Sequence, residues 1–186
     1  MAISLDATIG SKDANTYILK GDADDIVDGF VEDDDVLAWS TSTDDQKNRA
    51  LYTAAQRLDR EEYLGVRTNG DQAMQWPRIG VRKPDVYVNR YRTGFPYRYQ
   101  DEMFDKDEIP DQIKKAQTVL AVYLNNNKDG IGLSGLEDYK NVQIGPINVT
   151  PDKYGAVGAD RIPPMVQQYL TGLRISTPGT LSIRRS

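Results

Sequence analysis

The clearest helical pattern in the chain begins at Thr43. Thr43 and Gln46 form a capping box, and two aspartates fill the first turn that follows. Apolar residues then recur at helical spacing as a narrow stripe made of Leu51, Ala54, Ala55 and Leu58. The pattern predicts a helix that starts at Thr43, runs to about Leu64 near Gly65, and packs on one side only.

A second helix is predicted from Pro110, a residue that suits the first helical position. Its apolar face contains Ile113, Ala116, Gln117, Leu120, Tyr123 and Leu124 at spacings of three and four. It ends in the run Asn125–Asn127, which favours a turn. We expect the two long helices to pack antiparallel and to form the core.

Shorter elements are predicted around this pair. They are extended pieces in residues 1–20, a helix at 22–30, an inserted β-ribbon at 82–105, a β-hairpin within 139–150 and a helix at 165–173. Residues 174–186 have little to bury and predict an extended tail that orders on a partner. The predicted fold is therefore mainly α (α+β), a small helical bundle in one domain (1–173) followed by the tail (174–186).

Composition narrows the function classes. The chain has 186 residues, 39% of them hydrophobic and 27% charged, which suits one compact domain. It contains no Cys and no His, so thiol chemistry is excluded and the usual general base and metal ligand are missing. There is no apolar run of about 20 residues and no signal-peptide pattern at the start. We expect a soluble protein made in the cytoplasm, without catalytic residues, metal, cofactor or membrane contact.

Carboxylates are the remaining candidates for chemistry. Glu61 with Glu62, or Asp101 with Glu102, could act as acid and base with a bound metal in a hydrolase, although adjacent helical residues point in different directions. The acidic run around residues 22–35 lacks the register of a calcium loop. The glycines of residues 130–135 lack the Lys and Ser or Thr that end a phosphate loop. A carboxylate hydrolase is therefore the least favoured hypothesis for this chain.

Charge is strongly segregated along the chain. Residues 1–45 contain twelve acidic residues and two lysines, whereas residues 78–98 contain six basic residues and one aspartate. Such segregation suits contact between copies, with an acidic face of one copy meeting a basic arm of another. The alternative is a solvated acidic face and a loose basic tail.

The loop at residues 65–81 joins the two long helices and carries the pair Trp76-Pro77 among turn-forming residues. We expect Trp76 and Pro77 to be structural anchors that pin this loop to the helices. Arg67 and Arg78 would then face outward as residues of a subunit interface.

The predicted ribbon interleaves tyrosine and arginine. The residues concerned are Tyr87, Arg90, Tyr91, Arg92, Tyr97, Arg98 and Tyr99. Bases stack on aromatic rings and guanidinium groups follow phosphates, so this composition is typical of a single-stranded DNA platform. Tyr and Arg also dominate protein interfaces. Since no other nucleic-acid motif accompanies them, we favour a subunit interface that includes Tyr87, Arg90, Tyr91, Arg92, Tyr97 and Arg98.

Several short motifs in the same order resemble the head-to-tail connector, or adaptor, proteins of tailed bacteriophages. They are Ala14-Asn15-Thr16-Tyr17, a helix leading into Gly65, Arg67-Thr68, Gln72-Ala73-Met74-Gln75-Trp76-Pro77-Arg78, Ile109-Pro110 and Ile113-Lys114-Lys115-Ala116. The similarity in the order of elements extends over residues 14–175. Some members of this group carry a label that relates them to a primosomal single-strand-binding protein.

The resemblance implies a structural virion protein in the neck between head and tail. Such subunits form a ring, commonly of twelve copies, below the portal protein and next to tail or neck proteins, and packaged DNA passes through the lumen without sequence-specific binding. The C-terminal segment usually enters the portal, which assigns portal docking to Arg174, Arg184 and Arg185 of the tail. The alternative function is a single-stranded DNA-binding module that uses the Tyr/Arg-rich ribbon.

Overall fold

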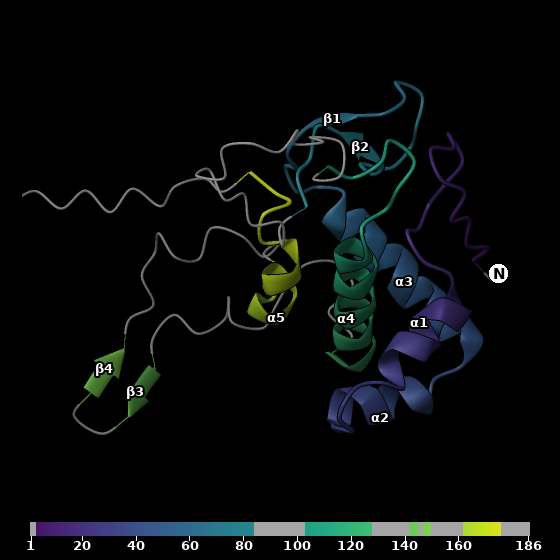
Figure 1. Cartoon of the computed structure of the whole chain (residues 1–186). Helices are drawn as coiled ribbons and strands as arrows, with labels where there is room; N and C mark the ends of the chain where they lie inside the picture. Colours follow the sequence, from purple (N-terminus) through teal and green to yellow (C-terminus); the bar gives the residue numbers. More distant parts are fainter. Residues whose placement is uncertain (1–2, 84–102, 128–141, 145–146, 150–161, 176–186) are drawn as a thin grey trace, which may run out of the picture.

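Two antiparallel helices form the centre of the molecule in the computed structural model, which describes residues 3–83, 103–127, 142–144, 147–149 and 162–175. Helix α3 (Asp44–Leu58) and helix α4 (Asp111–Asn127) pack along each other (Figure 1). At mid-length the Gln117 side chain donates to the carbonyl of Leu51 over 2.9 Å. Asn125, near the end of α4, donates to Ser42 just before α3 over 2.8 Å, so the helices run in opposite directions.

Helix α3 begins as predicted and ends earlier than predicted. The Thr43 amide donates to the Gln46 side chain over 2.9 Å, which forms one half of the capping box. The last helical residue is Leu58, six residues before the predicted end at Leu64. The helix stops because the chain turns there and Tyr63, which is buried, leaves the helical path to pair with Arg174 in a β-bridge.

Helices α1 (Lys20–Val27) and α2 (Asp34–Ser40) cover one side of α4. Helix α2 is not among the elements that the sequence patterns predict. The Asp33 side chain accepts from the amide of Val36 over 2.9 Å and caps the helix. Trp39, 1% exposed, then anchors α2, and its indole donates to Asp24 of α1 over 2.8 Å.

The C-terminal part of the described chain packs on α4. Helix α5 (Pro164–Gln167) and the 3-10 turn η2 (Gln168–Leu170) bury Val166, Leu170 and the following Leu173. The predicted helix 165–173 is therefore shorter and partly 3-10.

Two small sheets complete the mainly α, α+β fold, which is the predicted class. Strand β1 (Val66–Arg67) pairs antiparallel with β2 (Arg78–Ile79) within the loop 65–81. Strands β3 (Val142–Ile144) and β4 (Ile147–Val149) form the hairpin predicted within 139–150. Among the described residues, no helix is long and apolar enough to cross a membrane.

Candidate functional site

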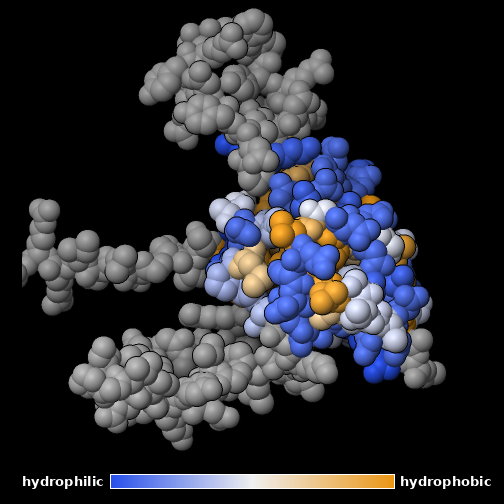
Figure 2. Space-filling model, turned by 90° about the horizontal axis from the view of Figure 1, so that it is seen from below, coloured by the Kyte–Doolittle hydropathy of each residue, from blue (hydrophilic) through white to orange (hydrophobic). Residues whose placement is uncertain are grey.

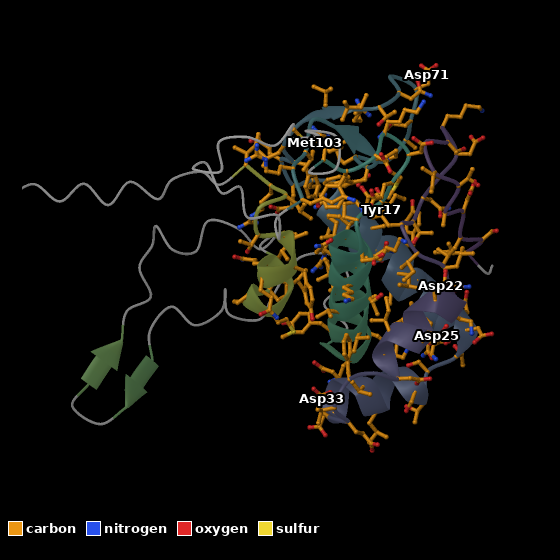
Figure 3. All side chains as sticks on the ribbon, in the orientation of Figure 1. Tyr17, Asp22, Asp25, Asp33, Asp71 and Met103 are labelled. Atoms are coloured by element: carbon orange, nitrogen blue, oxygen red, sulfur yellow. The ribbon has the colours of Figure 1, made fainter. Side chains whose placement is uncertain are left out.

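The loop 65–81 folds into a compact unit at one end of the helix pair (Figures 1 and 3). Gly65 has a φ of +71°, and a Cβ at this position would lie 2.3 Å from the carbonyl oxygen of Ile79, so only glycine fits there. The buried side chain of Gln72 donates to the carbonyls of Met74 (2.8 Å) and Pro77 (3.1 Å). The loop is thus held by internal hydrogen bonds.

Trp76 attaches this loop to the core. It is 1% exposed, and its ring meets Tyr63 and Phe104 edge-on at centroid distances of 5.7 and 6.0 Å. The peptide bond between Trp76 and Pro77 is cis. The indole Nε1 finds no acceptor among the described residues, so this ring is held by packing.

Arg78 is buried, and the prediction that it faces outward is wrong. Its guanidinium donates to the carbonyls of Leu64 (2.7 Å), Gly65 (2.7 Å) and Tyr63 (3.2 Å), and to Gln75. A guanidinium has five N–H donors in a fixed plane, so it can satisfy several carbonyls that the chain exposes on leaving a helix. Burial lowers the pKa of Arg78. In this subunit Arg78 holds the loop together.

Two other arginines of the predicted site lie in the described part. Arg67 is exposed, as the sequence predicts, and donates to the carbonyl of Gln72 over 3.2 Å. Arg174 forms an ion pair with Glu61 at 2.8 Å, and the next residue, Ile175, donates its amide to the Glu62 carbonyl over 2.8 Å. The folded body therefore extends at least to Ile175, and assigning Arg174 to a free tail is wrong.

A buried polar cluster joins the N-terminal segment to the loop, and the sequence patterns did not reveal it. The Tyr17 hydroxyl donates to the Asp59 carboxylate, and the amide of Gln75 donates to both, over 3.1 and 3.3 Å. Burial raises the pKa of Asp59, although these hydrogen bonds oppose the change. Burial and the nearby Asp59 charge raise the pKa of Tyr17. Tyr17, Asp59 and Gln75 are far apart in the sequence, so no local pattern predicts that they meet. The one sequence feature that could have pointed to the cluster was Tyr17, in the motif that precedes the first helix.

Residues 82–104 start and return at one place on this loop. Arg82 and Met103 pair in an antiparallel bridge, and the amide of Phe104 donates to the carbonyl of Val81 over 3.0 Å. The Lys83 ammonium lies 5.5 Å from the centroid of the Phe104 ring. We call this bridge the ribbon root. It brings the described residues on either side of residues 84–102, Lys83 and Met103, together next to Phe104, whose ring contacts Trp76.

Most of the predicted site residues lie outside the described part of the chain. They are Tyr87, Arg90, Tyr91, Arg92, Tyr97, Arg98, Tyr99, Arg184 and Arg185, together with the carboxylate pair Asp101 and Glu102. Within the described ranges, no group of three or more acidic side chains is placed to hold a metal ion. Glu61 pairs with Arg174 there.

The described residues form a small helical domain, and the bridge between Arg82 and Met103 marks where the Tyr/Arg-rich sequence 84–102 leaves the domain and rejoins it. The sequence model of one protein family, described as "Putative DnaT-like ssDNA binding protein", matches residues 1–186, and the chain belongs to this family. No curated protein and no solved structure matches the chain. The family description names DNA binding and does not mention phage connectors.

Proposed function

We propose that the chain is a non-catalytic protein that binds single-stranded DNA through residues 84–102. The observation that carries the proposal is the ribbon root: the bridge between Arg82 and Met103 joins the two points between which the sequence has four tyrosines and three arginines, and it lies beside the Trp76–Phe104 ring contact. The family description supports the same activity. Fixing both ends lowers the entropy that a binding segment loses on contact, which favours affinity.

The chemistry of the segment suits unpaired bases. Every base has a face that can stack on tyrosine, and arginine pairs with phosphate, so binding of this kind tolerates any sequence. Helices α1 and α2, together with the residues that connect them, contain eight acidic residues and one basic residue, Lys20. This acidic end would repel phosphates and confine DNA to the opposite end of the subunit.

The test is fluorescence anisotropy of a labelled oligo(dT) over a series of salt concentrations. Affinity should fall with salt, and replacing Arg90, Arg92 and Arg98 with Ala should reduce the slope of log K against log salt by about 2. Tyr91→Ala and Tyr97→Ala should each weaken binding by about 1 to 3 kcal/mol. Arg49→Ala, an exposed residue paired with Asp45 on α3, is the matched control and should bind normally. Absence of binding at low salt would overturn the proposal.

A second candidate function is a head-to-tail adaptor of a tailed phage. The resemblance of the motifs around Trp76 supports it, and so do the acidic end and the exposed arginine Arg67 at the other end, since a ring needs two complementary faces. In this role the copies, about twelve by that resemblance, would surround the DNA channel in the virion neck between the portal and tail proteins. The tail, with Arg184 and Arg185, would enter the portal protein.

Cryo-electron microscopy of virions whose genome encodes the chain tests the adaptor role. Absence of this protein from the neck of the virion would exclude that role. Truncation separates folding from docking. A stop after Ile175 should leave the subunit folded and abolish portal attachment. A stop after Gly172 is a poorer test, because it removes Leu173, which is 0% exposed in the core.

A further inference from the structure

An apolar groove opens at the acidic end of the subunit, between α2, α4 and α5. Its volume is about 260 Å³, and its apolar lining includes Phe30, Val36, Val119, Tyr123, Met165 and Tyr169. Small-molecule sites usually measure about 300–1,000 Å³, so the groove suits a few apolar side chains better than a ligand. Figure 2 views the molecule from this end and shows hydrophobic residues exposed among hydrophilic ones.

Two carboxylates of the groove already have partners within the subunit. Asp33 and Asp35 both belong to its lining. The Asp33 side chain accepts from the Val36 amide over 2.9 Å, and the Asp35 side chain accepts from the side chain of Asn126. These carboxylates cap α2 and join it to the end of α4, so an occupant of the groove does not need to supply a cation. The groove therefore fits an apolar, uncharged occupant.

The chain itself contains a segment with these properties, the β3–β4 hairpin. Three cross-strand pairs define its register: Val142 with Val149, Gln143 with Asn148, and Ile144 with Ile147. Successive residues of a strand alternate between the two faces of a sheet, and direct cross-strand partners share a face. The four β-branched apolar residues therefore share one face, and the two amide residues share the other. No residue of 142–149 is charged.

The hairpin and the groove both leave apolar surface uncovered. Among the described strands, β3 and β4 pair only with each other, and a two-stranded hairpin alone is marginally stable in water. In the groove, Val31 is 88% exposed and Met165 is 43% exposed. Figure 1 shows the hairpin apart from the helices, an arrangement in which both surfaces are open. Bringing them together would remove both from water.

The chain leads to and from the hairpin at the two sides of this groove. Tyr123, in the groove, is four residues before the end of α4 at Asn127, and Met165 is the second residue of α5. Fourteen residues connect α4 to β3, and twelve connect β4 to Ile162. An extended chain of twelve residues spans roughly 40 Å, whereas α4 is about 25 Å long. Both connections are therefore long enough to let the hairpin reach the groove.

We propose that the apolar face of the β3–β4 hairpin docks in the groove of its own subunit. Because the hairpin is covalently attached to α4 on one side and to α5 on the other, docking is intramolecular and a weak contact is sufficient to hold it. Docking would cover Val31 and Met165. It involves neither residues 84–102 nor a second copy of the chain, so it is independent of both candidate functions.

Oxidation of the full chain carrying Met165→Cys with oxidised diamide as the reagent tests this contact, because the chain has no cysteine of its own. Met165→Cys is combined with Ile147→Cys on the apolar face or, as the matched control, with Asn148→Cys on the other face. A disulfide requires Cα atoms within about 7 Å, so the first pair should close at least about 10-fold faster than the second. Mass spectrometry identifies the bond. Equal rates for the two pairs, or a rate that rises with protein concentration, would overturn the proposal.

The rate at which hydrogen peroxide oxidises Met165 gives a second readout without introduced cysteines. Ile144→Asp places a charge on the apolar face of the hairpin, and an unpaired charge is strongly disfavoured in an apolar groove, so docking should be lost. Met165 should then be oxidised at least about 3-fold faster than in the wild type, because the hairpin no longer shields it. Gln143→Asp places the same charge on the opposite face and should oxidise at the wild-type rate. The same rate in all three proteins would contradict docking.

Discussion

Replacing Trp76 with Ala tests whether packing of this ring holds the loop 65–81 on the core. The ring is 1% exposed and touches Tyr63 and Phe104 edge-on. Removing a fully buried Trp typically costs about 3 to 5 kcal/mol, and the two ring contacts account for about 0.5 to 1.5 kcal/mol each within that loss. We expect the free energy of unfolding to fall by about 4 kcal/mol.

The measurement is urea unfolding followed by far-ultraviolet circular dichroism. For a chain of this length, the same loss should lower Tm by roughly 8 to 16 °C. Trp76→Phe is the matched variant, because it keeps an aromatic ring and removes the indole N–H, which has no acceptor among the described residues. It should cost clearly less than Trp76→Ala, since a buried unpaired donor is itself unfavourable by about 1 to 3 kcal/mol.

The reasoning would be refuted if Trp76→Ala unfolded at the same urea concentration as the wild type. If stability were unchanged while sedimentation showed loss of assembly, Trp76 would belong to a subunit interface instead of the core. If Trp76→Ala and Trp76→Phe lowered the free energy of unfolding by the same amount, the ring contacts of Trp76 would not explain its contribution to stability.

Three further changes probe the polar groups. Relative to the wild type, Asp59→Asn should raise the free energy of unfolding more at pH 7 than at pH 4. Burial raises the pKa of Asp59, so in the wild type the stability linked to the protonated carboxyl is lost as pH rises through the folded pKa. Urea unfolding of both proteins at several pH values measures this difference. Asp24→Asn should lower the free energy of unfolding by about 1.5 to 3 kcal/mol at pH 7. Burial alone would raise the pKa of Asp24, but hydrogen bonds from Lys47 and Trp39 outweigh it and lower the pKa. The difference from the wild type should therefore shrink as pH falls below about 4, and an unchanged difference at pH 2 would contradict this. Arg78→Lys should lose about 2 to 4 kcal/mol in the same assay, because an ammonium cannot satisfy all the buried carbonyls, and a wild-type midpoint would show that water replaces those bonds.

Local patterns in the sequence predicted the two long helices and the short hairpin well. The capping box at Thr43 and the apolar spacing in residues 113–124 are local signals, and both helices form there. Helix α2 was missed because its anchor, Trp39, pairs with Asp24 on another helix, a contact that no local pattern shows. The end of α3 was misplaced for a similar reason, since Tyr63 pairs with Arg174 more than a hundred residues later.

The site was predicted less completely than the fold. The Trp-Pro pair marked the right loop, but the direction of each arginine depends on which carbonyls lie near it. Arg78 meets the carbonyls that the chain leaves unpaired beyond the end of α3 and turns inward, whereas Arg67, its partner on the neighbouring strand, turns to the surface. Both look alike in sequence, because burial of a guanidinium is decided by backbone acceptors that come together only in the folded chain.

The ribbon root has a consequence for how this domain can change. Because Arg82 and Met103 are direct partners in a β-bridge, the two ends of the intervening segment lie about one strand spacing apart, roughly 5 Å. Sequence of any length can therefore be inserted or exchanged between these two positions without moving a residue of the helical body. The helical body therefore sets no geometric limit on the length of chain that this bridge closes.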